Sequence, residues 1–291
     1  MKTLALTYAA LALVVAPHAF ADEPAPAVDR ILAESVTLDD PLLRALESGA
    51  DGETARGVYW AVKLWPKQYR ALRVCFFGGT KEARALIAEY ASSWNRADAS
   101  ISFDFGAPGE ERSCDPAGKT EAQIRVGFND TAQMQSAGGV DAVLRYPQDV
   151  PSINPVQFAN VTRASWNDAY HTQNVRHEFG HALGLMHEHQ SPNAPCEEEF
   201  DWDKIYDWAG GNREAVDNML RKLPADQFSA GPFDVKSIMM YQFPAWFFKA
   251  GDQAKCYPPT LNLDVSEGDL RQIATLYPKD EAVRAMQAEI T

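Results

Sequence analysis

The sequence has 291 residues, of which 46% are hydrophobic and 23% charged, so it can bury the core of one large domain or two modest ones. Its 27 basic and 40 acidic residues give a formal net charge of −13. An acidic surface of this size repels phosphate backbones, which excludes nucleic acid from the expected partners.

The first 21 residues have the order of a secretory signal peptide. Lys2 precedes an apolar stretch over residues 4–16, and the small-residue pattern Ala-Phe-Ala ends at residue 21. No segment approaches the roughly 20 apolar residues that a membrane helix needs. We therefore expect a secreted protein, extracellular or periplasmic, without stable membrane insertion. An uncleaved membrane anchor is the alternative.

Residues 22–56 differ in composition from a folded core. They are rich in Ala, Pro, Asp and Glu and carry only a short helical pattern, so we interpret them as a linker or pro-segment. The folded domain is expected to begin near Val58 and to cover residues 57–280. A charged tail over residues 281–291 would follow it.

The first half of this domain has the pattern of mixed α and β structure. Short apolar or alternating runs predict three strands, at residues 73–77, 101–105 and 124–128. Thr80 is expected to cap a helix after the first strand, because apolar residues recur at helical spacing from Leu86 to Trp94. An edge strand is expected over residues 140–146, between a glycine pair and a proline.

Two helices are predicted in the second half. Residues 166–183 suit a long helix that leads into a histidine-rich run. A final helix begins after Ser266, which forms a capping pattern with Asp269 three residues later, and it ends before Pro278.

Four cysteines lie far apart in a chain that is expected to meet an oxidising compartment, so two disulfides are predicted. Of the three possible connectivities we favour Cys75–Cys114 with Cys196–Cys256, because each pair then closes within one half of the chain. Zinc binding by these thiols is the competing interpretation, but no two of them have a metal-ligand spacing.

A run of histidines with one glutamate is the strongest pattern in the sequence. His177 and His181 are four residues apart, so on a helix their imidazoles project from one face and can bind one metal ion together. Glu178 lies beside them, where a carboxylate can take a proton from water that zinc activates and pass it to a leaving amine.

Gly184 and His187 extend this pattern to three ligands. Gly184 can adopt the left-handed conformation that ends a helix, so that the chain turns and His187 reaches the metal. Three neutral nitrogens with an open fourth position make a catalytic zinc site. The alternatives are ordinary hydrogen-bonded histidines and a structural zinc site, but no cysteine is placed to close the shell of the latter.

The run HEFGHALGLMHE at residues 177–188 resembles the HExxHxxGxxHE motif of the astacin-like metalloproteases, which belong to the metzincin clan. The segment SIMMY at residues 237–241 is similar to the astacin Met-turn. The resemblance extends to the strand and helix order of residues 58–190 and to residues 263–270. Two departures are Met240, where the family usually has histidine, and the positions of the cysteines.

This resemblance implies an α+β metzincin (zincin-like) fold, with a twisted mixed sheet, an active-site helix and two subdomains around a catalytic cleft. It also implies that Met239 lies beneath the zinc histidines. Tyr241 would be a zinc ligand in the resting enzyme and would swing away to stabilise the oxyanion. Glu188 would help to anchor the mature N-terminus, the alternative being an acidic residue on a turn.

Three further segments carry hypotheses with a plainer alternative. Residues 22–56 are a candidate inhibitory pro-segment in cis, in which Asp51 would block the zinc; a solvated turn is the alternative. The acidic run at residues 197–199 would attract a cation or basic substrate, or be a solvated loop. Residues 246–248, Trp-Phe-Phe, would line a substrate pocket or pack in the core.

These features predict a secreted zinc-dependent metalloendopeptidase, with a protein or peptide substrate and one catalytic Zn²⁺ ion. One alternative is a noncatalytic zinc-binding secreted protein that retains the protease fold; it would be marked by loss of Glu178 or of a ligand, and none is missing. The other is hydrolysis of a non-peptide amide or ester at the same site. The sequence carries no signal for the oligomeric state.

Overall fold

A computed structural model describes residues 58–117, 119–130 and 134–279. The predicted signal peptide, the linker or pro-segment and the C-terminal tail lie outside these residues. Val58 is buried together with the two aromatic residues after it, so the chain contributes to a core from the first described residue.

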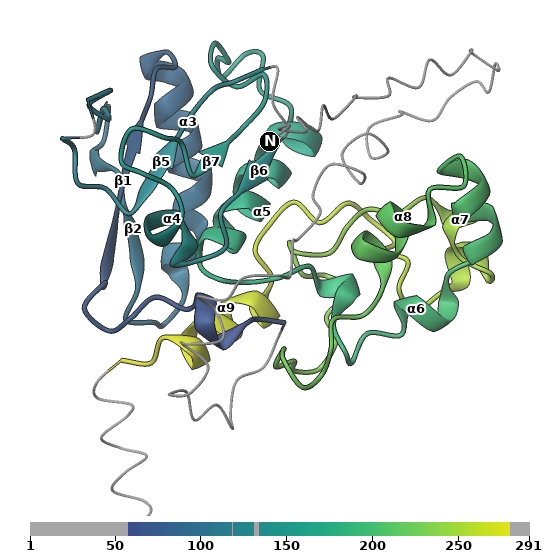
Figure 1. The fold of residues 1–291 in the computed structure, drawn as a ribbon. Coiled ribbons are helices and arrows are strands. Elements are labelled where there is room, and N and C mark those ends of the chain that lie inside the picture. The colour runs from purple at the N-terminus through teal and green to yellow at the C-terminus, as the bar shows by residue number, and fades with distance from the viewer. Residues whose placement is uncertain (1–57, 118, 131–133, 280–291) are drawn as a thin grey trace, which may run out of the picture.

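A five-stranded sheet forms one layer of the first lobe (Figure 1). In spatial order its strands are β2 (Ser102–Asp104), β1 (Ala71–Phe76), β5 (Ile124–Val126), β7 (Ile153–Asn154) and β6 (Gln135–Ser136). The first four run parallel, and β6 is an antiparallel edge strand. The three strands predicted from sequence are β1, β2 and β5. A two-stranded hairpin, β3 (Gly106–Ala107) with β4 (Glu110–Glu111), follows β2.

Helices α3 (Lys81–Ala91) and α5 (Gln173–Ala182) pack on this sheet and on each other (Figure 1). Thr80 caps α3 as predicted, since its hydroxyl accepts a hydrogen bond from the amide of Ala83. The apolar face of α5 enters the core of the sheet, where Phe179 meets Phe103 edge to face at a centroid distance of 4.9 Å. This burial fixes α5 against the sheet.

The prediction of an edge strand over residues 140–146 is wrong, because the chain forms a short helix there, α4 (Asp141–Leu144). The buried guanidinium of Arg125 gives the physical reason. It donates hydrogen bonds to the carbonyls of Ala142, Tyr146 and Val150, which curl this segment around the end of β5. Carbonyls gathered around one cation cannot also form a strand ladder.

The helix predicted over residues 166–183 begins later and opens with a π-helical turn, Asp168–Thr172, that leads into α5. Asn167 has an extended backbone, and its side chain accepts a hydrogen bond from the amide of Tyr170. A side chain that caps a helix in this way fixes its start. Trp166 therefore does not continue the helix, and its ring stacks on Tyr90 of α3 at 4.7 Å.

The second lobe contains more helix than the sequence indicated: α6 (Cys196–Glu199), α7 (Trp202–Trp208) and α8 (Arg213–Leu220). They surround an aromatic core whose largest fully buried members are Phe200, Phe243, Phe247 and Phe248. The final helix, α9 (Glu267–Leu276), has the predicted capping box, and it packs on the core of the first lobe through Ile273 (Figure 1).

Both predicted disulfides are confirmed. In the first lobe, Cys75–Cys114 joins β1 to the segment after β4. In the second lobe, Cys196–Cys256 joins the start of α6 to the segment after Phe248. Within the described residues, no helix combines the length and the apolar character that crossing a membrane requires.

Candidate metal centre and active site

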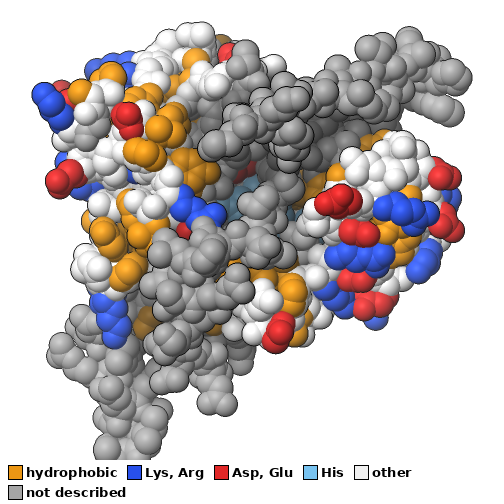
Figure 2. Space-filling model, in the orientation of Figure 1, with side chains coloured by type: hydrophobic (Ala, Val, Ile, Leu, Met, Phe, Trp, Pro, Cys, Tyr) orange, Lys and Arg blue, Asp and Glu red, His pale blue; other side chains and the backbone are white. Residues whose placement is uncertain are grey.

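Three histidines meet between the two lobes, and histidine side chains are visible in a hollow there (Figure 2). His177 and His181 come from one face of α5. Gly184 then adopts a positive φ of 93°, as predicted, and the chain turns so that His187 joins them. The Nε2 atom of His181 lies 3.1 Å from that of His177 and 3.1 Å from that of His187. Two nitrogens bound tetrahedrally at zinc-ligand distances would be about 3.3 Å apart.

The other nitrogen of each ring faces an oxygen atom. The Nδ1 atoms of His177 and His181 lie 2.9 and 2.8 Å from the carbonyls of Ile238 and Leu185. That of His187 lies 3.1 Å from Oε1 of Gln190. Each of these oxygens can only accept, so Nδ1 carries the proton in all three rings. Three Nε2 lone pairs then converge on one point, an arrangement that fits a bound cation and would be repulsive without one.

The C-terminal end of α5 is held from three directions. Helix-end carbonyls lack partners within the helix. Here the carbonyls of His181, Ala182 and Leu183 accept hydrogen bonds from the Gly139 amide, the Trp65 indole and the Tyr277 hydroxyl, at 2.8, 2.7 and 2.7 Å respectively. This end of the helix carries His181, so these hydrogen bonds hold that histidine in position.

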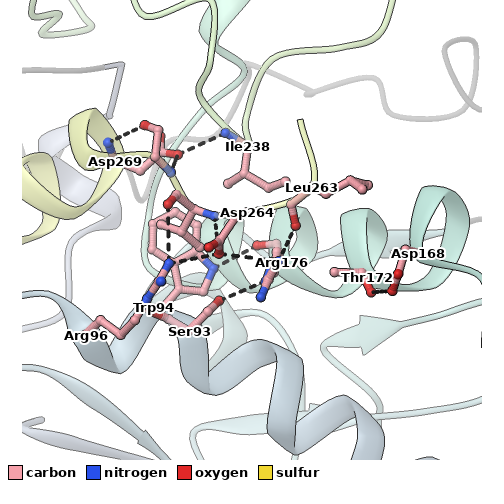
Figure 3. Close-up of polar contacts among 12 residues, drawn as sticks. Ser93, Trp94, Arg96, Asp168, Thr172, Arg176, Ile238, Leu263, Asp264 and Asp269 are labelled. Atoms are coloured by element: carbon pink, nitrogen blue, oxygen red, sulfur yellow. Dashed lines mark hydrogen bonds and ion pairs between the residues drawn. The ribbon is translucent and has the colours of Figure 1, made fainter. Parts of the chain in front are cut away.

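The face of α5 away from the histidines is fixed by a polar network (Figure 3). Arg176, next to His177, donates to the hydroxyl of Ser93 and to the carbonyl of Leu263, and it pairs with Asp264 at 3.3 Å. The indole of Trp94 donates to the carbonyl of Arg176 at 2.8 Å. Segments from both ends of the domain thereby hold the helix in its orientation.

The turn containing Met239 lies directly under α5. Gly180 is the contact point, because a Cβ atom built on it would be 2.3 Å from the sulfur of Met239. Asp269 of α9 holds this turn in place: its carboxylate accepts hydrogen bonds from the Ser237 hydroxyl at 2.6 Å and the Ile238 amide at 2.9 Å. The Ile238 carbonyl is the acceptor for His177, so a chain of contacts links α9 to this histidine.

The remaining predicted residues lie at the same place. Glu178 follows His177 and is 1% exposed. The ring of Tyr241 lies 4.4 Å from that of His187 and 5.5 Å from that of His177, measured between centroids. Glu188 is buried behind the site and accepts a hydrogen bond from the amide of Asp234, so it does not lie on a solvated turn. Burial, with smaller contributions from nearby carboxylates, raises the pKa of Glu188 to about 8.

Both a solved structure and a family model match this chain. The solved structure titled "Structure of myroilysin" is 29% identical, covers 77% of this chain and 100% of its own length, and has a TM-score of 0.62. A family model described as Astacin (Peptidase family M12A) matches residues 166–277, which include the three histidines, Glu178, Met239 and Tyr241. The chain is an astacin-like zinc metalloprotease.

Other matches to this astacin-like protein are weaker. A second structure, "Crystal structure of myroilysin", is 28% identical over 85% of this chain and 100% of its own, with a TM-score of 0.48. High choriolytic enzyme 1, a hatching enzyme zinc-protease from the medaka fish Oryzias latipes, is 15% identical, covers 77% of this chain and 98% of its own, and has a TM-score of 0.40. No curated protein matches the sequence significantly.

Two segments of the second lobe carried hypotheses. Residues 197–199 lie in α6 and not in a solvated loop. The carboxylates of this acidic run interact with other groups of the same lobe. Glu197 pairs with Arg221, and Glu198 pairs with Lys222. Glu199 accepts hydrogen bonds from the backbone amides of Lys255 and Cys256. Within residues 246–248 the two phenylalanines are core, and only the tryptophan is 39% exposed. Asp51 lies outside the described residues.

Sequence reasoning missed two residues that support the site. Gln190 orients His187, and Asp269, noted only as a helix cap, also anchors the Met239 turn. The position of Gln190 three residues after a ligand was a signal that could have been used. Nothing in the sequence connects Asp269 to residues some 30 positions earlier.

Proposed function

We propose that the chain is a secreted metalloendopeptidase whose catalytic residues are Glu178 and Tyr241. In this proposal His177, His181 and His187 bind the zinc ion, and Tyr241 is a fourth ligand in the resting enzyme. The observation that carries it is the convergence of three Nε2 lone pairs on one point with Glu178 next to the first of them. Bound zinc would supply Lewis acidity, which polarises a peptide carbonyl and lowers the pKa of water to about 7.

Glu178 acts as the general base and then as the general acid. Because it lies three residues before His181 on α5, its side chain projects from the helix face that carries the histidines. A carboxylate there accepts a proton from the attacking water and delivers it to the amine that leaves. The buried position excludes bulk water and strengthens the electrostatic part of this role.

Tyr241 stabilises the charge that develops on the substrate. Its ring packs against His187 and His189 at centroid distances of 4.4 and 4.8 Å. These contacts hold the phenol next to the proposed zinc ligands. A phenolic hydroxyl in a site of low dielectric constant can donate a hydrogen bond to the tetrahedral oxyanion. Three further residues support the site. Gly184 turns the chain so that His187 reaches the other histidines, Met239 packs under α5, and Glu188 is buried next to His187.

Export fits the chemistry of the described chain. Two disulfides persist in oxidising compartments, which favours an extracellular or periplasmic location. In this proposal residues 1–21 direct export, and residues 22–56 inhibit the protease in cis until they are removed. The substrate is a protein or peptide.

The test is digestion of an unbiased peptide library by the full chain, before and after limited proteolysis removes residues 22–56. We expect cleavage by the wild-type protein and a loss of at least about 10³-fold in Glu178→Gln, because general base catalysis is removed while zinc remains bound. Unchanged cleavage by Glu178→Gln would contradict the role of Glu178. Bound zinc without cleavage of any peptide would favour the noncatalytic alternative, and cleavage of esters alone would favour the second one.

A further inference from the structure

Asn174 is a buried asparagine on the active-site helix whose amide has no partner. The residue is 0% exposed, and neither its nitrogen nor its oxygen has a hydrogen-bond partner. Burying a polar group without a hydrogen bond costs free energy, and native proteins contain few such groups. An unpartnered amide in a well-packed helix therefore calls for a physical explanation.

The position of Asn174 in α5 places it on the catalytic face. It lies three residues before His177, four before Glu178 and seven before His181, and residues at these spacings share one face of a helix. The core-facing residues Val175 and Phe179 occupy a different face. Asn174 and Glu178 are four residues apart, which is about 6 Å along the helix axis.

Burial does not distinguish Asn174 from residues that must meet a substrate. Glu178, His177 and His187 are only 1–2% exposed in the same structure. His181 and Tyr241 are 9% and 7% exposed, so every residue of the site is buried, and Asn174 belongs to this group by both its burial and its helix face. Asn154 of β7 is a buried asparagine whose side-chain amide does have partners. It is 4% exposed and exchanges two hydrogen bonds with the backbone of Asn129.

We propose that Asn174 is a specificity-determining residue, which pairs with a side-chain carboxamide of the peptide substrate next to the scissile bond. The inference rests on the proposed function as a peptidase. An asparagine amide offers donors on nitrogen and an acceptor on oxygen. Another carboxamide, from Gln or Asn, satisfies both at once, whereas a carboxylate offers only acceptors and an aliphatic side chain offers neither.

Peptides that differ only at the residues flanking the scissile bond test this role. The series places Gln, Glu or Met, which have similar lengths, at one flanking position at a time. We expect the zinc-loaded wild-type protein to prefer Gln at one of these positions by roughly tenfold or more in kcat/KM, since a site built to hydrogen-bond a group rejects analogues that lack it. In Asn174→Leu the preference for Gln over Met should disappear, through a fall in kcat/KM for the Gln peptide.

Thermal unfolding supplies a second readout that does not require activity. Replacing an unpartnered buried amide by an apolar side chain of similar size should raise the Tm, so Asn174→Leu is expected to be more stable than wild type. Asn154→Leu is the matched control: it strands two backbone groups, so it should lower the Tm and leave the Gln preference unchanged.

Two results would overturn the proposal. One is a Gln preference that persists in Asn174→Leu. The other is a lower Tm for Asn174→Leu than for wild type, which would mean that the amide is bonded within the fold, for example to a buried water. Cleavage of none of the peptides would contradict the proposed function instead, and the Tm comparison would then still decide whether the Asn174 amide stabilises the fold.

Discussion

Gly180 shows how the absence of a side chain lets two segments of the metal centre pack closely. It lies between His177 and His181 on α5, and its bare backbone lets the Met239 turn approach the helix closely. Interiors are packed closely enough that even one added methyl group is felt. The Met239 turn and the histidine helix therefore act as one packed unit.

Gly180→Ala should separate these two segments. The new methyl would meet the Met239 sulfur at 2.3 Å and the Trp94 ring at 2.8 Å, so we expect a loss of about 1–3 kcal/mol in the free energy of unfolding and weaker zinc binding. Urea unfolding and a competitive zinc titration measure the two effects. Gly138→Ala, where no atom lies within 4 Å of the new methyl, is the control and should change neither. Wild-type zinc affinity in Gly180→Ala would show that the turn does not support the ligands.

Helix α9 illustrates how an element far from the metal in sequence supports it in space. Its capping box is readable from Ser266 and Asp269, and the structure confirms it. The second use of Asp269, as an anchor for the Met239 turn, depends on tertiary packing and leaves no local pattern. Burial raises the pKa of Asp269 to about 6 despite its three hydrogen bonds.

Asp269→Ala and Ser266→Ala separate the two uses of this helix start. Both variants remove the capping box, and Ser266→Ala should cost about 1 kcal/mol of stability and leave zinc binding intact. Asp269→Ala also leaves the Ser237 and Ile238 donors without their acceptor, so we expect a loss of about 3 kcal/mol and a 10–100-fold weaker zinc affinity. Equal zinc affinities in the two variants would argue against a link from α9 to His177.

Local patterns account for the elements that the sequence predicted correctly, and long-range contacts account for those it did not. The strands β1, β2 and β5, the cap of α3 and the ends of α9 all follow from short-range periodicity and capping residues. The strand predicted after Val140 is wrong because Arg125, on the earlier strand β5, donates hydrogen bonds to the carbonyls of this segment. The meeting of the three histidines was predictable because the HExxH spacing places two of them on one helix face, whereas the residues that support them come from distant segments.

At the scale of the whole molecule, the metal centre lies where two separately packed cores meet. The core of the first lobe contains the sheet, α3, α5 and Ile273 of α9, and the aromatic core of the second includes Tyr241. Each lobe has one disulfide, so neither bond crosses between them. The position of Tyr241 relative to the histidines therefore depends on the integrity of the second lobe.

Removing the Cys196–Cys256 disulfide should loosen that lobe. We expect the Cys196→Ala/Cys256→Ala variant to lose about 2–4 kcal/mol of unfolding free energy, because a long loop is no longer closed in the unfolded chain. Urea unfolding of the two proteins under oxidising conditions gives the difference. The three histidines lie outside this loop and Tyr241 lies inside it, so zinc should still bind. Loss of bound zinc would show that the three histidines depend on the second lobe.

The most direct test of the account is a zinc titration of the metal-free protein. The full chain is first treated by limited proteolysis to remove residues 22–56, and peptide cleavage is then measured after each addition of zinc. The three converging Nε2 atoms define one site, so we predict no cleavage at the start and a linear rise that stops at one equivalent of zinc per chain. His181→Ala should not regain activity over the same range. Full cleavage by the metal-free protein, or one tightly bound zinc per chain without any cleavage, would contradict the account.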